Sequence, residues 1–272
     1  MLRTTDASWA EARAAVASAA TRVGALLRSV RHPDAPALGK WNVTDVAVHL
    51  SHVVDAIAAM AKGGGSFADD VWSLSKLTEG MVKAESTRDL SALADRIETS
   101  VADYLTVLEA SEENGLRKWM VKGVELPLST LTCQILNELT VHGRDIAVAD
   151  GQPWPIERSH AALIVCGFLF PVLGVLKRTM VEEKEAAGLR ACMEVRVRGG
   201  CRVYLRFDDG DLAVEEAPWR PVDCRLSVDP AAFLLVAWGR VDQWGPISRG
   251  QLLAWGRKPW LGLKLRALLR NA

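Results

Sequence analysis

The chain has 272 residues, of which 49% are hydrophobic, enough for one large domain or two modest ones. Its 33 basic and 33 acidic residues cancel, so charge gives no general reason to expect nucleic acid or an anionic membrane as a partner. The longest apolar run, residues 161–176, is shorter than the ~18 residues of a membrane span and contains Pro171, so we expect no transmembrane segment.

The five cysteines are odd in number, and no two of them form a C-x-x-C pair. They are Cys133, Cys166, Cys192, Cys201 and Cys224. This pattern is typical of neither a disulfide framework nor a zinc knuckle, so we expect free thiols in a reducing compartment. The N-terminus turns polar at once and lacks the apolar core of a signal peptide. We therefore expect a soluble, cytoplasmic protein.

The first quarter of the chain predicts two helices. Apolar residues from Trp9 to Leu27 recur at helical spacing over residues 6–30, with Asp6 or Ser8 as the cap. Two prolines in residues 32–36 then force a loop. The second helix begins after Trp41, capped by Asn42 or Thr44, and ends before the glycines at 63–65.

Helical patterns continue to about residue 181. We predict helices over residues 68–85 and 89–111, and a hairpin or extended loop over residues 116–126. Pro127 starts a further helix, which Gly151 ends. An apolar helix over residues 156–181 follows, and its charged tail to residue 188 suggests a solvated helix end or an interdomain linker.

The pattern changes after about residue 190, where apolar and charged residues alternate as in half-exposed strands. The predicted strands cover residues 193–198, 201–207, 212–215 and 224–228, and the predicted helices cover 229–238, 249–255 and 259–270. Strands followed by helices favour a separate α+β domain. The sequence therefore predicts two domains, a helical bundle over residues 1–185 and an α+β domain over residues 190–272.

Three polar residues on predicted helices form a candidate metal site. Glu138 and His142 lie one turn apart on the helix that Pro127 starts, so both side chains share one face. His49, on the helix after Asn42, is the best third ligand, because side chains of facing helices converge in a bundle. Three protein ligands and an open position are typical of catalytic zinc. The alternative is that Glu138 balances local charge and the histidines are hydrogen-bonded core residues.

Neighbouring residues have two interpretations each. Arg144 and Asp145 either orient the ligands or pair with each other on the surface. His52 either joins His49 or faces solvent, and Cys133 is expected to be buried filler away from the Glu138 and His142 face.

The order of these motifs resembles a known family. The motifs are Trp41-x-x-x-Asp45-x-x-x-His49-Leu50, then Glu138-x-x-x-His142-Gly-x-Asp145-x-Ala147, then Gly151. They resemble the mycothiol-dependent maleylpyruvate isomerase family and, more broadly, the DinB-like metal-binding bundles. The C-terminal motifs are similar to that family's second domain, which is sterol-carrier-like; they are Asp229-Pro-Ala-Ala-Phe, Trp238-Gly-Arg, Gly250-Gln-Leu and Lys258-Pro-Trp260-Leu. The resemblance covers nearly the whole chain.

The resemblance implies a fold and a chemistry. It implies a DinB-like four-helix bundle followed by an α+β sterol-carrier-like domain, with His49, Glu138 and His142 as ligands of Zn²⁺ or a similar divalent metal. It also implies a mycothiol-type thiol cosubstrate, and isomerisation or S-transfer on a small electrophilic substrate. We expect a monomer or small homo-oligomer. It assigns neither the substrate nor the catalytic residues.

Two alternatives remain open at this point. One is a non-catalytic small-molecule or lipid-binding protein, with an apolar cavity lined by residues such as Phe233, Leu234 and Trp238. The other is a zinc-dependent hydrolase that uses bound water instead of a thiol.

Overall fold

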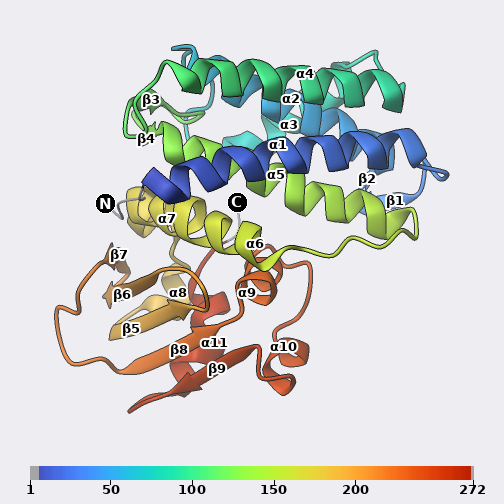
Figure 1. The fold of residues 1–272 in the computed structure, drawn as a ribbon. Helices are drawn as coiled ribbons and strands as arrows, with labels where there is room; N and C mark the ends of the chain where they lie inside the picture. The colour runs from blue at the N-terminus through green and yellow to red at the C-terminus, as the bar shows by residue number, and fades with distance from the viewer. Residues whose placement is uncertain (1–5, 271–272) are drawn as a thin grey trace. The chain divides into compact units, whose positions relative to one another are not determined.

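The computed structural model describes residues 6–270, which form two compact units that divide between Pro155 and Ile156 (Figure 1). The first unit is the predicted helical bundle, and the second is the predicted α+β domain. Each unit is described below by itself.

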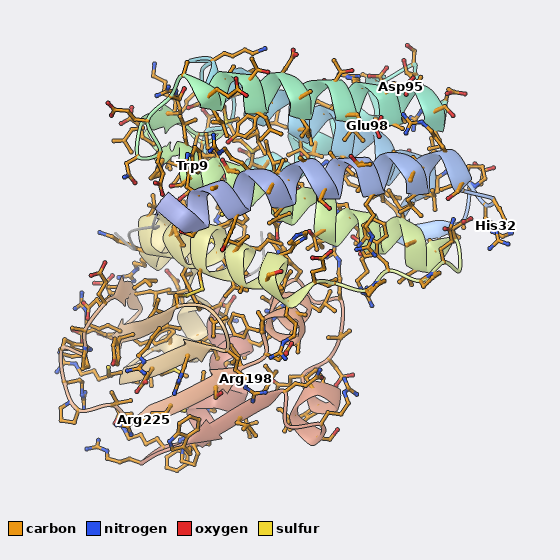
Figure 2. The ribbon with its side chains drawn as sticks, viewed as in Figure 1. Trp9, His32, Asp95, Glu98, Arg198 and Arg225 are labelled. Atoms are coloured by element: carbon orange, nitrogen blue, oxygen red, sulfur yellow. A yellow bond between two sulfur atoms is a disulfide. The ribbon has the colours of Figure 1, made fainter. Side chains whose placement is uncertain are left out.

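Four long helices form the first unit. They are α1 (Asp6–Ser29), α2 (Val43–Ala61), α4 (Leu90–Glu109) and α5 (Leu128–Ala149). Both α1 and α2 pack against α4 and α5, so the four helices close around one apolar core. At the surface, Arg28 of α1 forms ion pairs with Asp95 and Glu98 of α4, and the two acidic residues are labelled in Figure 2.

Smaller elements complete the bundle. They are the hairpin β1 (Pro36–Leu38) with β2 (Trp41–Asn42), the helix α3 (Ser73–Ala84), and the hairpin β3 (Leu116–Lys118) with β4 (Glu125–Pro127). The α3 helix starts later than predicted, because Ala68 pairs with Val121 in an isolated bridge and is committed to that contact. The predicted hairpin over residues 116–126 is confirmed.

Local sequence signals set where the helices begin. The Asn42 side chain accepts a hydrogen bond from the Asp45 N–H, and the Asp45 carboxylate accepts one from the Asn42 N–H. This reciprocal capping box fixes the start of α2. Asp89 caps α4 in a similar way by accepting from Ala92. Of the two predicted caps of α1, Asp6 has no described side chain and Ser8 lies within the helix.

The second unit contains a five-stranded sheet in the order β7-β6-β5-β8-β9. The strands are β5 (Arg190–Val197), β6 (Arg202–Asp208), β7 (Asp211–Glu215), β8 (Cys224–Val228) and β9 (Leu252–Trp255). The strands β5, β6 and β7 form an antiparallel meander, whereas β8 runs parallel to β5. Around this sheet the helices are α6 (Arg158–Ile164), the π-helical turn η1 (Val165–Leu169), α7 (Phe170–Leu176), the 3-10 turn η2 (Lys177–Met180), α8 (Glu183–Ala186), α9 (Pro230–Ala237), α10 (Trp244–Ser248) and α11 (Trp260–Leu268).

The prediction of a helix over residues 249–255 is wrong. Residues Leu252–Trp255 form the edge strand β9, which pairs antiparallel with β8. A short apolar run has no decisive period, so the partner strand determines its conformation. Gly250 and Gly256 bracket the strand at φ values of +67° and +117°, which a helix would not accept.

The structure also places the division between the units about thirty residues before the predicted boundary at residues 185–190. The apolar helical stretch from α6 to α7 groups with the sheet, because α6 packs against α9 and α7 packs against β7. Its helical pattern predicts that it belongs to the bundle, but a helical pattern alone does not indicate which core a helix joins.

The expectation of five free thiols is wrong for two of the cysteines. Cys166 and Cys201 form a disulfide, although they are 35 residues apart in sequence. Cys133, Cys192 and Cys224 are free and buried. The spacing of cysteines in sequence says little about pairing, because the fold alone brings two distant side chains together.

Two helical stretches of the described residues, Val43–Ala61 and Arg158–Met180, have the length and composition of a membrane span. The second is longer than the run expected from sequence, because Pro171 lies at the start of α7, directly after the π-helical turn, and does not end the helix. Core helices of soluble proteins can have the same length and composition, so the finding is weak evidence for a membrane span. The absence of a transmembrane segment stays a prediction.

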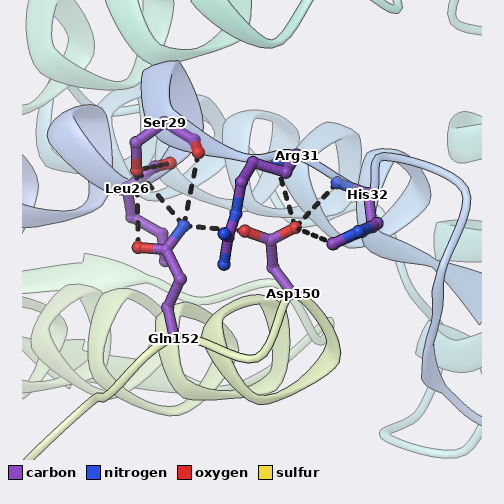
Figure 3. A network of polar contacts seen from close by, with 6 residues as sticks. All are labelled: Leu26, Ser29, Arg31, His32, Asp150 and Gln152. Atoms are coloured by element: carbon purple, nitrogen blue, oxygen red, sulfur yellow. Dashed lines mark hydrogen bonds and ion pairs between the residues drawn. The ribbon is translucent and has the colours of Figure 1, made fainter.

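The end of α5 is joined to the end of α1 by one buried carboxylate (Figure 3). Oδ1 of Asp150 accepts hydrogen bonds from the backbone N–H groups of Arg31 and His32 at 2.9 and 2.7 Å. Oδ2 accepts one from the Gln152 side chain at 2.7 Å. Burial by itself raises the pKa of Asp150, but these donors outweigh it and lower the pKa to about 2.

We predict that Asp150→Asn lowers the free energy of unfolding by about 2 kcal/mol at pH 7, because the charged hydrogen bonds that the buried carboxylate accepts from two backbone N–H groups are lost. Since the pKa is lowered in the folded state, this stabilisation is present above pH 4 and is lost as the pH falls toward 2. Urea denaturation of both proteins across this range measures the difference. The exposed Asp34→Asn variant is the control. A difference that grows toward low pH would contradict the assignment.

Candidate metal site

The three predicted ligands lie together between α2 and α5, two helices that pack against each other in the bundle core. His49 lies two turns after the capping box that starts α2, and Glu138 and His142 lie one turn apart in the middle of α5. One nitrogen or oxygen atom from each of the three residues lies within 4.8 Å of the other two. The packing of these two helices therefore brings together residues that are about ninety positions apart in sequence.

One carboxylate oxygen is central to this cluster. Oε2 of Glu138 lies 3.4 Å from Nε2 of His142 and 3.8 Å from Nε2 of His49. The two imidazole rings meet edge to face, with centroids 4.7 Å apart. All three side chains are at most 14% exposed, so the donor atoms converge in a nearly dry part of the core.

Three neighbouring side chains hold the cluster in place. Oδ2 of Asp145 lies 3.1 Å from Nδ1 of His142, which leaves Nε2 of that imidazole directed at Glu138. The Asn137 amide donates a hydrogen bond to Oε1 of Glu138 at 3.3 Å, and the Trp41 ring lies 5.2 Å from the His49 ring. A carboxylate on the far nitrogen of a histidine is the usual outer partner of a metal-binding imidazole.

A glycine beside His142 fixes this part of α5. A Cβ atom on Gly143 would lie 2.5 Å from the Trp154 ring, so only glycine admits that ring here. The Trp154 indole N–H donates to the Thr140 carbonyl at 3.1 Å, and the Arg22 guanidinium lies over the ring at 3.8 Å. The tryptophan thus packs against the turn of α5 that carries His142.

The cluster shifts the pKa of each member in a different direction. Burial lowers the pKa of His49. Burial also opposes the charged form of His142, but Asp145 and Glu138 outweigh this effect and raise its pKa to about 9. Burial acts to raise the pKa of Glu138, yet contacts with His142 and His49 hold it well below its usual range. At neutral pH the cluster therefore holds an ionised Glu138, a protonated His142 and a neutral His49.

These residues fit a divalent transition metal. Two imidazole nitrogens and a carboxylate oxygen are a donor set that zinc takes in catalytic sites, where a fourth position stays open. The donors are close together and already desolvated, and Asp145 orients one of them. A divalent cation would take the place of the proton on His142, because the cation and the proton each compensate the negative charge of the same buried carboxylates.

The remaining candidates are placed as follows. Arg144 is partly exposed, and its side chain leaves α5 on a different side from that of His142. It is therefore less well placed than Asp145 to orient a ligand. Cys133 is buried, as predicted. His52 turns to Glu85, whose Oε2 lies 3.1 Å from its Nε2 without hydrogen-bond alignment. Trp41 belongs to the quoted motif that leads to His49, but its contact with the His49 ring was not predicted, and the hydrogen bond from Asn137 to Glu138 was missed.

Comparison with known protein families decides the relationship. Residues 9–147 match the family described as the mycothiol maleylpyruvate isomerase N-terminal domain, and this match covers half of the chain. The chain belongs to this family. Residues 174–269 match the SCP-2 sterol transfer family, so the sterol-carrier-like character of the second unit is confirmed. No curated protein matches the chain.

Solved structures share the fold across both units. The crystal structure of the mycothiol-dependent maleylpyruvate isomerase aligns with a TM-score of 0.51 at 13% identity, covering 90% of this chain and 92% of that chain. A mutant of that enzyme aligns over the same shares of both chains, with a TM-score of 0.53 and 13% identity. At this identity the likeness supports the fold, a helical domain followed by a sheet-containing SCP-2-like domain.

We predict that the wild-type protein purified without chelators carries about one divalent metal per chain, and that His49→Ala, Glu138→Gln and His142→Ala each abolish this binding. Asp145→Asn should weaken metal affinity by about 10- to 100-fold, because it only orients His142. Elemental analysis and competition with a chelator measure both effects. His160→Ala, a histidine outside the cluster, should keep the metal. Wild-type protein without metal would contradict the prediction.

We also predict that metal binding at pH 7 releases about one proton. His142, with its pKa raised to about 9, is protonated in the metal-free protein and must lose a proton before Nε2 can bind. The apparent affinity should therefore fall about tenfold per pH unit below 9, and proton release should vanish above that pH. Calorimetry in buffers of different ionisation enthalpy counts the protons. Binding without proton release at pH 7 would contradict this pKa.

Proposed function

We propose that the protein is a zinc-dependent enzyme that uses a mycothiol-type thiol to isomerise a small electrophilic substrate or to transfer sulfur to it. The observation that carries the proposal is the cluster of His49, Glu138 and His142, on the domain that matches the mycothiol maleylpyruvate isomerase family. The structures of the mycothiol-dependent maleylpyruvate isomerase, which share the fold, add support.

The chain's residues have distinct tasks in this proposal. His49, Glu138 and His142 would hold the metal from two helices, and Asp145 would fix the tautomer of His142 through Nδ1. Zinc in such a site lowers the pKa of a coordinated thiol, so that the thiol reacts as a thiolate near neutral pH. Burial of the three side chains keeps competing water away from this position.

The proposal extends to the setting of the reaction. Low-molecular-weight thiols are kept reduced in the cytoplasm, and we place the protein there, as a monomer or small homo-oligomer. Its partners would be the thiol and a small-molecule substrate. The balanced charge of the chain gives no reason to expect nucleic acid as a further partner.

The second candidate is a non-catalytic protein that binds a small apolar ligand, and the SCP-2 match over residues 174–269 favours it. Of the side chains predicted to line an apolar cavity, Leu234 is fully buried in the core of the second unit. Phe233 is partly exposed, and its ring centroid lies 6.0 Å from that of Phe170. Ligand binding by this route would not depend on the metal, so it should survive chelation.

We predict that turnover of maleylpyruvate or another small electrophile requires both the metal and mycothiol. His142→Ala should lower kcat/KM by more than about 100-fold, whereas His160→Ala should leave it unchanged. A panel of electrophiles assayed with and without mycothiol measures this.

The same assay separates the alternatives. Turnover without any thiol would favour a hydrolase that uses bound water. Binding of apolar ligands that survives chelation, without turnover of any substrate, would favour the second candidate. Either result would contradict the proposal.

A further inference from the structure

The two cysteines joined by the disulfide, Cys166 and Cys201, differ in exposure from the other three cysteines of the chain. Cys166 lies in the π-helical turn η1, and Cys201 lies in the turn between β5 and β6. Both residues are partly exposed, whereas Cys133, Cys192 and Cys224 are buried. Burial raises the pKa of Cys133 to about 12 and raises the pKa of the other two thiols as well. Only the paired sulfurs are therefore open to chemistry with solutes.

The turn between β5 and β6 is shaped to receive the sulfur of Cys166. A Cβ atom on Gly200 would lie 3.0 Å from Sγ of Cys166 and 3.2 Å from the Val197 side chain, so a larger residue would push the sulfur away. Gly199 adopts φ +75°, which a residue with a side chain rarely does. Two consecutive glycines thus allow the chain to turn tightly against the sulfur.

The same turn directs a hydrogen-bond donor at that sulfur. The backbone N–H of Cys201 donates to Sγ of Cys166 at 3.0 Å. A donor in this position favours a thiolate at Cys166 over a neutral thiol. No such donor is directed at Sγ of Cys201 by the hydrogen bonds found among the described residues. The two sulfurs are therefore unequal, and Cys166 is the better leaving group.

We propose that the pair is a site of thiol–disulfide exchange, in which a low-molecular-weight, cysteine-bearing thiol modifies Cys201. The thiolate of the small molecule attacks Sγ of Cys201 and forms a new sulfur–sulfur bond to it. The bond to Cys166 breaks, and Cys166 leaves with the electron pair as a thiolate stabilised by the Cys201 N–H. The Cys166 thiolate reverses the step by attacking Sγ of Cys201, which re-forms the disulfide and releases the small molecule as a thiolate, and no further oxidant is required.

Disulfides in thiol-rich compartments are commonly of this reactive kind, and π-helical turns often occur at functional positions. The exchange uses neither the metal nor the residues of α2 and α5. A result that contradicts the exchange therefore does not contradict the proposed reaction, and the reverse also holds.

The test is an adduct map of the full-length protein purified without reductant. Acid quenching, unfolding and alkylation with iodoacetamide should label the three free cysteines and leave Cys166 and Cys201 linked. After incubation of the native protein with millimolar N-acetylcysteine, mass spectrometry should find N-acetylcysteine on Cys201 and the alkyl group on Cys166. Free thiols at both positions before treatment, an adduct on Cys166 instead, or a disulfide that stays intact would each overturn the proposal.

A matched pair of variants tests the inequality of the two sulfurs. In Cys201→Ser the donor N–H stays beside Cys166, and in Cys166→Ser the thiol of Cys201 is left without it. Cys166 in the first variant should react with iodoacetamide several-fold faster at pH 7 than Cys201 in the second. An equal or slower rate would refute the assignment of the leaving group. Should either variant fail to fold, the adduct map of the wild-type protein still decides the proposal.

Discussion

The candidate site depends on the packing of α2 against α5, because this contact buries charged and polar side chains that neither helix could bury alone. Glu138 is desolvated, the protonated His142 compensates its charge, and the neutral imidazole of His49 lies 3.8 Å from the same oxygen. Asp145 supports His142 from the opposite nitrogen. Burying such groups costs free energy unless each one is paired, and a metal held by the same donors would compensate them more fully than a proton. The rest of the bundle sets the distance and register of these two helices.

Much of the bundle could be predicted from the sequence, because helices carry local signals. The capping box at Asn42 and the proline before α5 mark where the two site helices begin, and the spacing of Glu138 and His142 places both on one face. The third residue is different. Nothing local connects His49 to α5; its place in the cluster was expected from the convergence of side chains between facing helices, and the resemblance to a family whose motifs occur in the same order supported it.

The errors share one physical cause, which is that contacts between distant residues leave no local pattern. Residues Leu252–Trp255 became a strand because β8 offers an unpaired edge, and the helix over residues 158–176 joined the sheet because α9 and β7 pack against it. The disulfide joins cysteines 35 residues apart, which only the folded chain brings together. The hydrogen bond from Asn137 to Glu138 was likewise not predicted. Sequence reasoning identified the candidate ligands better than it identified what surrounds them.

The central claim is that His49, Glu138 and His142 hold a metal with a position open to a thiol. The most direct measurement is the optical spectrum of the cobalt(II)-substituted protein, recorded before and after addition of mycothiol. We predict that mycothiol produces a sulfur-to-metal charge-transfer band, that its intensity saturates at one thiol per chain, and that His142→Ala abolishes it. A protein that binds cobalt at this cluster but shows no sulfur band at saturating mycothiol would contradict the account.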